Sequence, residues 1–120
     1  MKNIKYRSRE RVCVRAQQVW LILVGVVMCR TGSIVTITYQ DLSEKLGFAQ
    51  ANRLNRELGL IRDYCLANEL PPLNSIVVNS RTGEPGFGAK TSPESTARLD
   101  QIKVMRINWS AYRVPDFCND

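Results

Sequence analysis

Apolar residues between positions 8 and 29 recur mostly every three or four residues, the spacing of one face of an α-helix. Ile22 and Val24 fill the flanks of this face, so we expect the second half of the helix to be buried on most sides. Residues 11–15 alternate between charged and apolar positions, which would also suit a strand and leaves the start of the helix open. The apolar face consists of Val12, Ala16, Val19, Trp20, Leu23, Val26 and Val27.

A short strand and a second helix are predicted next. Residues 33–37 are mostly β-branched, which favours a strand. Thr38 has the position of a helix cap, and Asp41 follows three residues later in a variant of the capping box. Gly47 suits the end of that helix, so we expect a short helix between Thr38 and Gly47.

The longest amphipathic stretch runs from Gln50 to Ala67 and predicts a third helix. Asn52 and Arg56 lie opposite its apolar stripe, and Arg53 lies on one flank. Asparagine and arginine at the start of a second helix are residue types that contact base edges or phosphates. This helix is therefore the first candidate for a binding surface. Its expected buried stripe is Leu54, Leu58, Ile61 and Cys65.

Turn-forming residues divide the rest of the chain. Residues 75–80 predict a strand, and residues 81–88 contain three glycines, which favour a hairpin turn. The spacing of these glycines matches neither GxxxxGK[ST] nor GxGxxG, so a phosphate-binding loop is the weaker interpretation. Residues 92–102 predict a further helix, with Ser92 as its cap, and residues 105–109 alternate as in an edge strand.

This order of elements predicts an α+β fold. We expect a single winged helix-turn-helix domain with a small antiparallel β-sheet as its wing, followed by an extra C-terminal helix and strand. Residues 16–120 would form this domain, and residues 1–15 a basic N-terminal arm or the start of the first helix. A chain of 120 residues is long enough for one hydrophobic core.

Positive charge is concentrated at the N-terminus. The chain has 17 basic and 11 acidic residues, and residues 1–15 hold six of the former and one of the latter. The arm therefore carries a net charge of +5, and the rest of the chain +1. Such an arm attracts phosphate groups by releasing counterions, whatever the base sequence. A solvated terminus with no ligand is the alternative.

The cysteines predict neither a metal site nor a disulfide framework. The four cysteines are widely spaced, and the chain has no histidine, so the usual zinc ligand patterns are missing. We expect reduced thiols in a cytoplasmic protein, with Cys29 and Cys65 as unreactive core residues. The longest apolar run, from Val19 to Cys29, has 11 residues and is shorter than the ~20 that a membrane-spanning helix needs. We expect no metal, no cofactor and no membrane partner.

Catalysis has little support in the residue types. Without histidine, a Ser-His or Cys-His arrangement cannot form. Histidine-free ribonucleases can use arginine, tyrosine and glutamate, and Tyr39, Arg53, Arg56 and Glu57 keep that class open.

Several short motifs resemble the DNA-binding domain of O6-alkylguanine-DNA alkyltransferases and alkyltransferase-like proteins. These motifs are Gln18-Val19-Trp20, Gly32, Thr38-Tyr39-Gln40-Asp41-Leu42 and Leu46-Gly47, and the resemblance covers about residues 16–88. It implies that the second helix of the motif enters the minor groove. It also implies that Tyr39 contacts the DNA backbone and that Arg53 fills the gap left by a flipped base.

The active-site motif of that family is absent from this chain. Where the family has Pro-Cys-His-Arg, this chain has Leu73-Asn74-Ser75-Ile76, so the accepting cysteine and its histidine are both absent. Alkyl transfer is therefore excluded on chemical grounds.

The first hypothesis is a non-catalytic protein that binds nucleic acid, as duplex DNA, through the helix from residue 50 to 67. Alternatives are a protein-interaction module (an adaptor, an inhibitor or a subunit of a complex), which the near-neutral body favours, and a small ribonuclease-type toxin. The predicted nucleic-acid contacts are Tyr39, Gln50, Asn52, Arg53, Arg56, Arg81, Arg7, Arg9 and Arg11.

Overall fold

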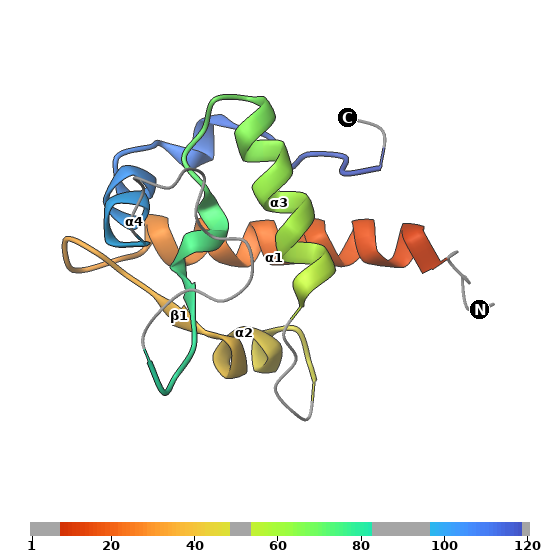
Figure 1. Cartoon of the computed structure of the whole chain (residues 1–120), viewed down its shortest axis with the longest axis horizontal. Coiled ribbons are helices and arrows are strands. Elements are labelled where there is room, and N and C mark those ends of the chain that lie inside the picture. The colour runs from red at the N-terminus through yellow and green to blue at the C-terminus, as the bar shows by residue number, and fades with distance from the viewer. Residues whose placement is uncertain (1–7, 49–53, 83–96, 119–120) are drawn as a thin grey trace.

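The computed structural model describes residues 8–48, 54–82 and 97–118, and these are mostly helical (Figure 1). The elements in chain order are α1 (Ser8–Met28), β1 (Ile37–Thr38), α2 (Tyr39–Lys45), α3 (Asn55–Ala67), the 3-10 helix η1 (Leu73–Ile76), β2 (Val77–Val78), α4 (Ala97–Met105) and the 3-10 helix η2 (Trp109–Ala111).

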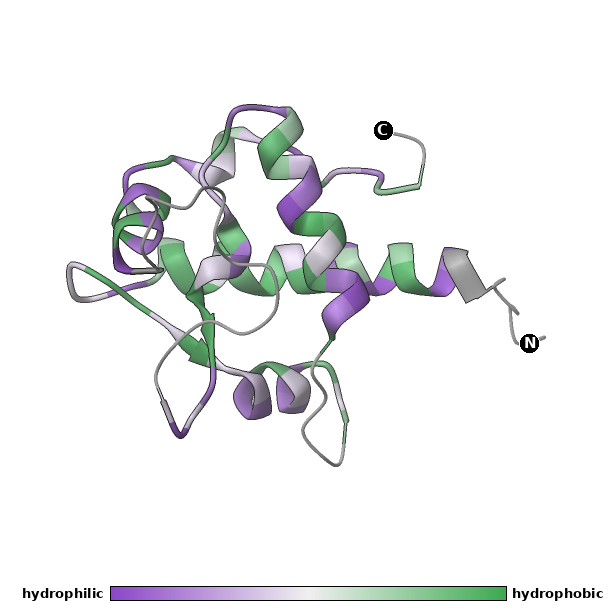
Figure 2. Cartoon of the chain, viewed as in Figure 1, coloured by the Kyte–Doolittle hydropathy of each residue, from purple (hydrophilic) through white to green (hydrophobic). Residues whose placement is uncertain are grey.

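Helix α1 is the central element, and its predicted position is confirmed. Its buried face packs against α3, η1 and η2, and the predicted apolar spacing accounts for that burial. Figure 2 shows hydrophobic residues along α1 and α3 where the helices cross, and hydrophilic ones on the outer side of α2. The buried residues of α1 are Cys13, Ala16, Val19, Trp20, Leu23 and Val27.

Part of α1 has the length and composition of a membrane span. Residues Glu10–Met28 have a mean hydropathy of 1.5, and a third of this window (33%) is buried inside the fold. A core helix of a soluble protein and a signal sequence share these properties. The 11-residue apolar run therefore understates how apolar the whole helix is.

The predicted antiparallel wing is wrong. Strands β1 and β2 form a two-stranded parallel sheet, in which Ile37 pairs with Val77 and Thr38 with Val78. Helices α2 and α3 lie between the two strands in the chain, and such a helical crossover returns the chain in the same direction as the first strand. Most of the expected wing turn, residues 83–88, lies outside the described residues.

The connection between α2 and α3 also differs from a helix-turn-helix. It covers residues 46–54, nine positions, whereas that motif joins its helices by about three or four. Helix α3 starts at Asn55 and not at Gln50, because Leu54 adopts a left-handed conformation (φ 54°) that cannot continue a right-handed helix. The end of α3 at Ala67 and its buried stripe of Leu54, Leu58, Ile61 and Cys65 are confirmed.

Local capping around α2 follows the prediction. The backbone N–H of Asp41 donates to Thr38 Oγ1 at 3.1 Å, as expected for an N-cap. Gly47 adopts a positive φ of 90°, which a residue without a Cβ reaches at low cost. Thr38 is thus both the last residue of β1 and the N-cap of α2.

Two predictions for the C-terminal part are wrong. Residues 105–109 form no strand: Met105 ends α4, and Trp109 begins η2 with its side chain fully buried. The Trp109 indole N–H donates to the Val104 carbonyl at 2.8 Å, which turns the chain back onto α4. The predicted strand over residues 75–80 is limited to β2, because η1 occupies the residues before it.

The cysteines also differ from the prediction. Cys13 in α1 and Cys118 near the C-terminus form a disulfide across 105 positions of sequence. Cys29 is exposed, whereas Cys65 is buried as expected. No spacing motif marks the bonded pair, because the two sulfur atoms meet only when the C-terminal segment packs on α1.

Candidate nucleic-acid interface

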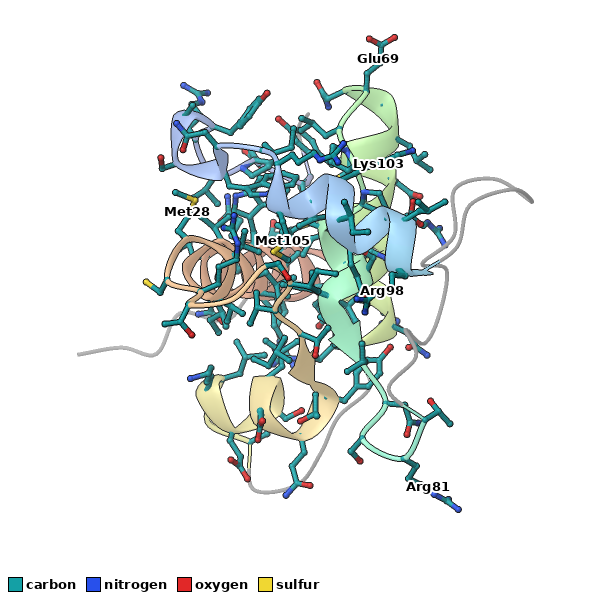
Figure 3. The ribbon with its side chains drawn as sticks, turned by 90° about the vertical axis from the view of Figure 1, so that its left-hand side faces the viewer. Met28, Glu69, Arg81, Arg98, Lys103 and Met105 are labelled. Carbon is teal, nitrogen blue, oxygen red and sulfur yellow. A yellow bond between two sulfur atoms is a disulfide. The ribbon has the colours of Figure 1, made fainter. Side chains whose placement is uncertain are left out.

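Three segments that carry predicted contact residues lie at one end of the molecule. Helix α2, the first turn of α3 and the chain that leaves β2 all lie on the same side of α1 (Figure 1). The view turned by 90° agrees, with α2 and Arg81 both below α1 (Figure 3). We call this region the α2 end, defined by Tyr39–Lys45, Asn55–Arg56 and Asn79–Thr82.

Arg56 is the best placed of the predicted contacts. It is exposed in the first turn of α3, and no carboxylate of the described residues lies within ion-pair distance of it. The next residue, Glu57, points the other way and is 5% exposed. Leu54, at the N-cap position, has no polar side chain and does not cap the helix. A guanidinium beside the positive end of the α3 dipole favours an anion there.

Arg81 is a second exposed cation at the α2 end. Its backbone N–H donates to Asn79 Oδ1 at 2.8 Å, an Asx-type turn that fixes the direction of the chain after β2. Figure 3 shows the Arg81 side chain pointing away from the body of the protein. The side chain is therefore free to meet a ligand that approaches from this end.

Tyr39 is only partly available. It is half-buried at the start of α2 and packs against the hydrophobic core. Its carbonyl accepts a 2.8 Å hydrogen bond from the Ser43 hydroxyl, inside the helix. A backbone contact by Tyr39, as the family resemblance implies, would use the exposed part of a residue that also supports the core.

The other residues that the sequence predicts to contact nucleic acid do not join Arg56, Arg81 and Tyr39 at the α2 end in the described structure. Arg11 is exposed on the N-terminal half of α1, which projects past α3 on the side away from the turn after β2 (Figure 1). Arg9 belongs to α1, but its side chain is not described. Outside the described residues lie Arg7, Gln50, Asn52 and Arg53.

One basic residue of the predicted arm has a structural role. Arg15 Nη1 lies 3.6 Å from the Glu57 carboxylate, and its guanidinium carbon is 4.9 Å from the Phe48 ring centroid. These contacts join α1, α3 and the segment after α2. Arg15 is therefore occupied within the fold and is a poor candidate for a phosphate contact.

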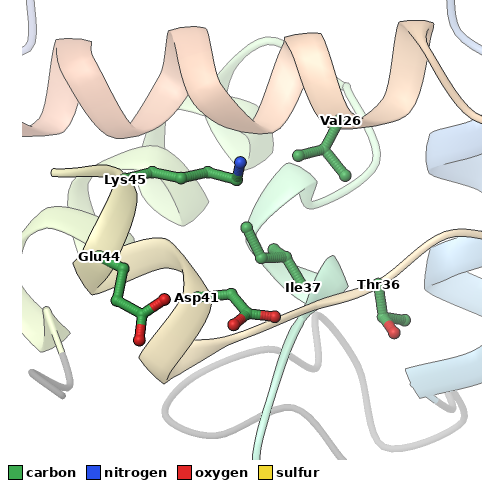
Figure 4. Close-up of a pocket in the computed structure, with 6 residues that line it drawn as sticks. All are labelled: Val26, Thr36, Ile37, Asp41, Glu44 and Lys45. Atoms are coloured by element: carbon green, nitrogen blue, oxygen red, sulfur yellow. The ribbon is translucent and has the colours of Figure 1, made fainter.

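A cleft of about 450 Å³ lies between α1 and α2 (Figure 4). Figure 4 shows Lys45 reaching into the space between the helices, with the Asp41 and Glu44 carboxylates along α2. The carboxylates repel phosphate groups, so an anionic ligand would approach α2 from its other side. The lining is completed by Val26, Thr36 and Ile37.

A second cavity, of about 420 Å³, lies between α4 and residues 69–72. Asp100 lines it and is 1% exposed, and Asp100 Oδ2 has no hydrogen-bond partner. Burial raises the pKa of the Asp100 carboxyl above its ordinary value, and the Lys103 ammonium opposes part of that rise. Figure 3 shows Lys103 on α4 and Glu69 above it, far from Arg81.

The described residues show no constellation for metal binding. No group of three or more cysteine, aspartate or glutamate residues is suitably arranged in residues 8–48, 54–82 and 97–118. Cys65, on the buried stripe of α3, is also unsuited to nucleophilic chemistry, because burial raises the pKa of its thiol to about 11.

Segment η1 stands where the resemblance places the alkyltransferase active site. Its residues Leu73, Asn74, Ser75 and Ile76 are all buried, and the Ser75 carbonyl accepts a 2.9 Å hydrogen bond from Gln101 Nε2. The segment is thus tied to α4 as part of the core. No family model matches the chain, and no curated protein or solved structure matches it either. The alkyltransferase resemblance therefore stays a prediction.

Two features of the α2 end are missing from the sequence prediction. Lys45 is a third cation there, and the pattern does not single it out because it follows Glu44 in a helix of mixed charge. The start of α3 at Asn55 is the other, and it places Arg56 in the first turn of the helix. The sequence carries no capping signal for that start, because leucine at position 54 is a residue type that helix N-caps disfavour.

Proposed function

We propose that the protein binds nucleic acid, as duplex DNA, through the α2 end and without catalysing a reaction. The observation that carries this proposal is the exposed Arg56 in the first turn of α3, at the same end of the molecule as Arg81. Both guanidinium groups lie apart from the carboxylates of the described chain. Two cations and a helix N-terminus provide the positive potential that a phosphate backbone requires.

The basic arm would add affinity that does not depend on base sequence. Residues 1–15 hold most of the positive charge of the chain, and Arg11 is exposed at the projecting end of α1. In this proposal the arm contacts phosphates further along the duplex, since the N-terminal half of α1, which carries Arg11, lies at the opposite end of the body from the chain that leaves β2 (Figure 1).

A non-catalytic role is supported by the state of the groups that a histidine-free ribonuclease would use. Glu57 is 5% exposed and ion-paired with Arg15, so it cannot serve as a general base toward an external ribose. Tyr39 is half-buried, and the chain has no histidine. In this proposal the protein leaves the bound nucleic acid chemically unchanged.

We also propose that the protein is cytoplasmic, because its proposed partner is nucleic acid. Helix α1 would then be a core helix, in keeping with its buried Ala16, Val19 and Leu23. Fractionation of cells that express the full chain tests this part: protein in the soluble fraction, together with nucleic acid, is expected. Recovery from the membrane fraction would contradict it.

Fluorescence anisotropy with a labelled 20-base-pair duplex, titrated at several salt concentrations, tests the binding itself. Arg56→Glu and Arg81→Glu should each weaken binding about tenfold, and each should lower the slope of log K against log salt by about one. Arg113→Glu is the matched control, because Arg113 is exposed in the C-terminal segment on the other side of α1. A flat salt response, or equal affinities for all three variants, would overturn the proposal.

A protein-interaction role is the second candidate, favoured by one observation on α1. Leu21 and Met28 are 56% and 44% exposed on one face of this helix, seven residues apart. Two exposed apolar side chains on one helix face supply an apolar surface against which a second protein can pack. Co-purification of a stoichiometric protein partner, abolished by Leu21→Glu and unaffected by Arg56→Glu, would favour this candidate over DNA binding.

A further inference from the structure

The C-terminal segment from Arg113 to Cys118 lies across α1 and α3 without forming a helix or strand of its own. We call it the strap. Its conformation depends on contacts with the helices beneath it, since a segment without a backbone hydrogen-bond ladder gains little stability from itself. These contacts therefore determine whether the strap stays closed.

The contacts that join the strap to the helices include a covalent bond, a hydrogen bond and an aromatic contact. The disulfide links Cys118 to Cys13 in α1. One helical turn further along α1, the Gln17 side-chain amide donates to the Pro115 carbonyl at 2.8 Å. The third contact is aromatic and is made by Phe117. These contacts lie between Cys13 and Trp20 of α1 and at Tyr64 of the neighbouring α3, so the strap closes over a single area.

The strap covers an aromatic cluster. The Phe117 ring packs edge-on against Trp20 of α1 at 6.1 Å and against Tyr64 of α3 at 6.0 Å between centroids. Trp20 in turn packs edge-on against Tyr64 at 5.6 Å. Trp20 is 1% exposed and Phe117 8%, so removal of the strap would open the Trp20 and Tyr64 rings to water.

The two bonded cysteines differ in exposure. Cys13 is 7% exposed on the buried face of α1, whereas Cys118 is half-buried near the end of the chain. A thiolate that attacks the disulfide must approach one sulfur along the S–S axis, so we infer that Cys118, the more exposed residue of the pair, is the target. Cys13 is then the leaving group.

We propose that the Cys13–Cys118 disulfide is a redox-operated latch that a dithiol reductant opens to release the strap. The first thiolate of the reductant attacks Cys118 Sγ, forms a mixed disulfide and expels the Cys13 thiolate, which takes up a proton. The second thiol of the reductant then displaces Cys118, which also leaves as a thiol after protonation. The protein disulfide gains two electrons and two protons, and the reductant is oxidised to its own disulfide.

Opening the latch leaves the strap attached to the helices by noncovalent contacts. The effective concentration of Phe117 over the aromatic cluster falls, because the chain end is no longer fixed at Cys13. The released strap would uncover a surface on α1 and α3 while the rest of the core remains folded. This inference does not depend on nucleic-acid binding, since the strap lies on the other side of α1 from the α2 end (Figure 1).

The first experiment establishes the bond in the protein itself. The full chain is purified without reductant, its free thiols are blocked, and its tryptic peptides are analysed by mass spectrometry. A peptide pair linked through Cys13 and Cys118 is expected. Its absence, with both cysteines blocked as free thiols, would overturn the latch.

The second experiment measures the strap by amide hydrogen exchange before and after treatment with dithiothreitol. Exchange in residues 113–118 should rise at least tenfold on reduction, while exchange in α3 stays constant. Cys29→Ser is the matched control, because it removes an exposed free thiol and should behave like the wild type. Cys118→Ser should show the open strap in both conditions, and reduced wild-type protein provides the same comparison should that variant fail to fold.

Two outcomes of the exchange experiment contradict the latch. Unchanged exchange in the strap after reduction would mean that its noncovalent contacts hold it without the bond. Increased exchange throughout α1 and α3 would mean that the disulfide maintains the whole fold and does not control one segment. A local increase in the strap, reversed when the protein is reoxidised, is the result expected of a latch.

Discussion

Arg15 and Glu57 form an ion pair between α1 and α3, with Arg15 Nη1 3.6 Å from Glu57 Oε2. The Glu57 side chain is 7% exposed and that of Arg15 32%. The Glu57 carboxylate is therefore largely removed from water, and the Arg15 guanidinium balances most of its charge. Arg15 also lies over the Phe48 ring. A single side chain thus connects the central helix with α3 and with the segment that follows α2.

We expect Arg15→Met to destabilise the protein, because it leaves a buried carboxylate without its partner. The loss should be about 2 kcal/mol, less than the ~3–5 kcal/mol of a fully buried pair, since Arg15 is partly solvated. Urea unfolding followed by circular dichroism measures it. Arg56→Met is the control, an exposed arginine near Glu57 in sequence, with an expected change below about 0.5 kcal/mol.

The double variant Arg15→Met, Glu57→Leu distinguishes the free energy of the ion pair from the cost of burying an unpaired charge. Removing both charges should recover part of the stability lost in Arg15→Met, because no buried charge remains unpaired. A double variant less stable than the single one would show that Glu57 is stabilised by other groups.

Leu23 and Leu21 give a matched test of how α1 is buried. Leu23 is fully buried and Leu21 is 56% exposed, two positions apart on the same helix. Leu23→Ala should cost about 2–5 kcal/mol, as expected for a large-to-small change in a packed core, and Leu21→Ala less than about 1 kcal/mol. Chemical denaturation of both variants measures the difference. Equal losses would contradict the packing of α1 described here.

Local sequence patterns predict the helices well where the fold buries one continuous face. In α1 most of the predicted face packs inward, and the stripe from Leu54 to Cys65 does the same in α3. The second half of α1 is not buried on most sides, however, because Leu21 and Met28 are exposed on its outer face. Thr38 likewise caps α2 through an oxygen that the sequence places three residues before Asp41. Each of these signals arises from residues within one or two helical turns.

The strand pairing cannot be predicted in the same way. β1 and β2 have two residues each, too few for an alternating pattern, and Ile37 and Val77 pair across 40 positions of sequence. Whether they run parallel or antiparallel depends on the route of the chain through α3 and η1, which no local pattern encodes. The same holds for the disulfide, because Cys13 and Cys118 approach only when the strap packs on α1.

The candidate site is predictable only in part for a related reason. The residue types of Arg56 and Arg81 make them candidates in the sequence. That both lie at the same end of the molecule depends on the parallel sheet, which places the chain after β2 beside α2. The role of Arg15 within the fold is not predictable from the local pattern, because Glu57, its partner, is 42 positions away. Long-range partners decide which cations remain free for a ligand.

Thr38→Ala should destabilise the start of α2 by about 1 kcal/mol, because the Asp41 N–H loses its acceptor. Thr38→Ser keeps the hydroxyl and should recover most of the loss. Thermal unfolding of the two variants measures the contribution of the cap. Equal destabilisation by serine and alanine would assign the effect to the β-branched methyl group in β1 and not to the hydrogen bond.

Asp100 makes stability depend on pH in a defined direction. Burial raises the folded-state pKa of this carboxyl above its ordinary value of 3.8, so the native state favours the protonated form. The resulting penalty is absent below the unfolded pKa, grows as pH rises and is complete above the folded pKa. We expect Asp100→Asn, which cannot ionise, to gain stability relative to wild type between about pH 3 and pH 7.

Urea unfolding of both proteins across that pH range measures the difference. The gain of Asp100→Asn should grow as pH rises through this range and be largest at neutral pH, where the wild-type carboxyl is forced to ionise in a buried place. A difference that does not vary with pH would show that the amide changes packing and not ionisation. A loss at neutral pH would mean that the Lys103 attraction outweighs burial.

Cys29 and Cys65 should differ strongly in reactivity toward a thiol reagent. Cys29 is exposed, whereas Cys65 is buried in α3 and its thiol pKa is raised to about 11. Since the thiolate is the reacting species, Cys65 should be unreactive at neutral pH as long as the core is closed. With the Cys13–Cys118 bond intact, a maleimide reagent should therefore label one site in the native protein and two after unfolding. In Cys29→Ser, native labelling should disappear. Rapid labelling of Cys65 in that variant would mean that α3 opens from the core on the timescale of the reaction, so the same measurement also reports the local stability of the helix that carries Arg56.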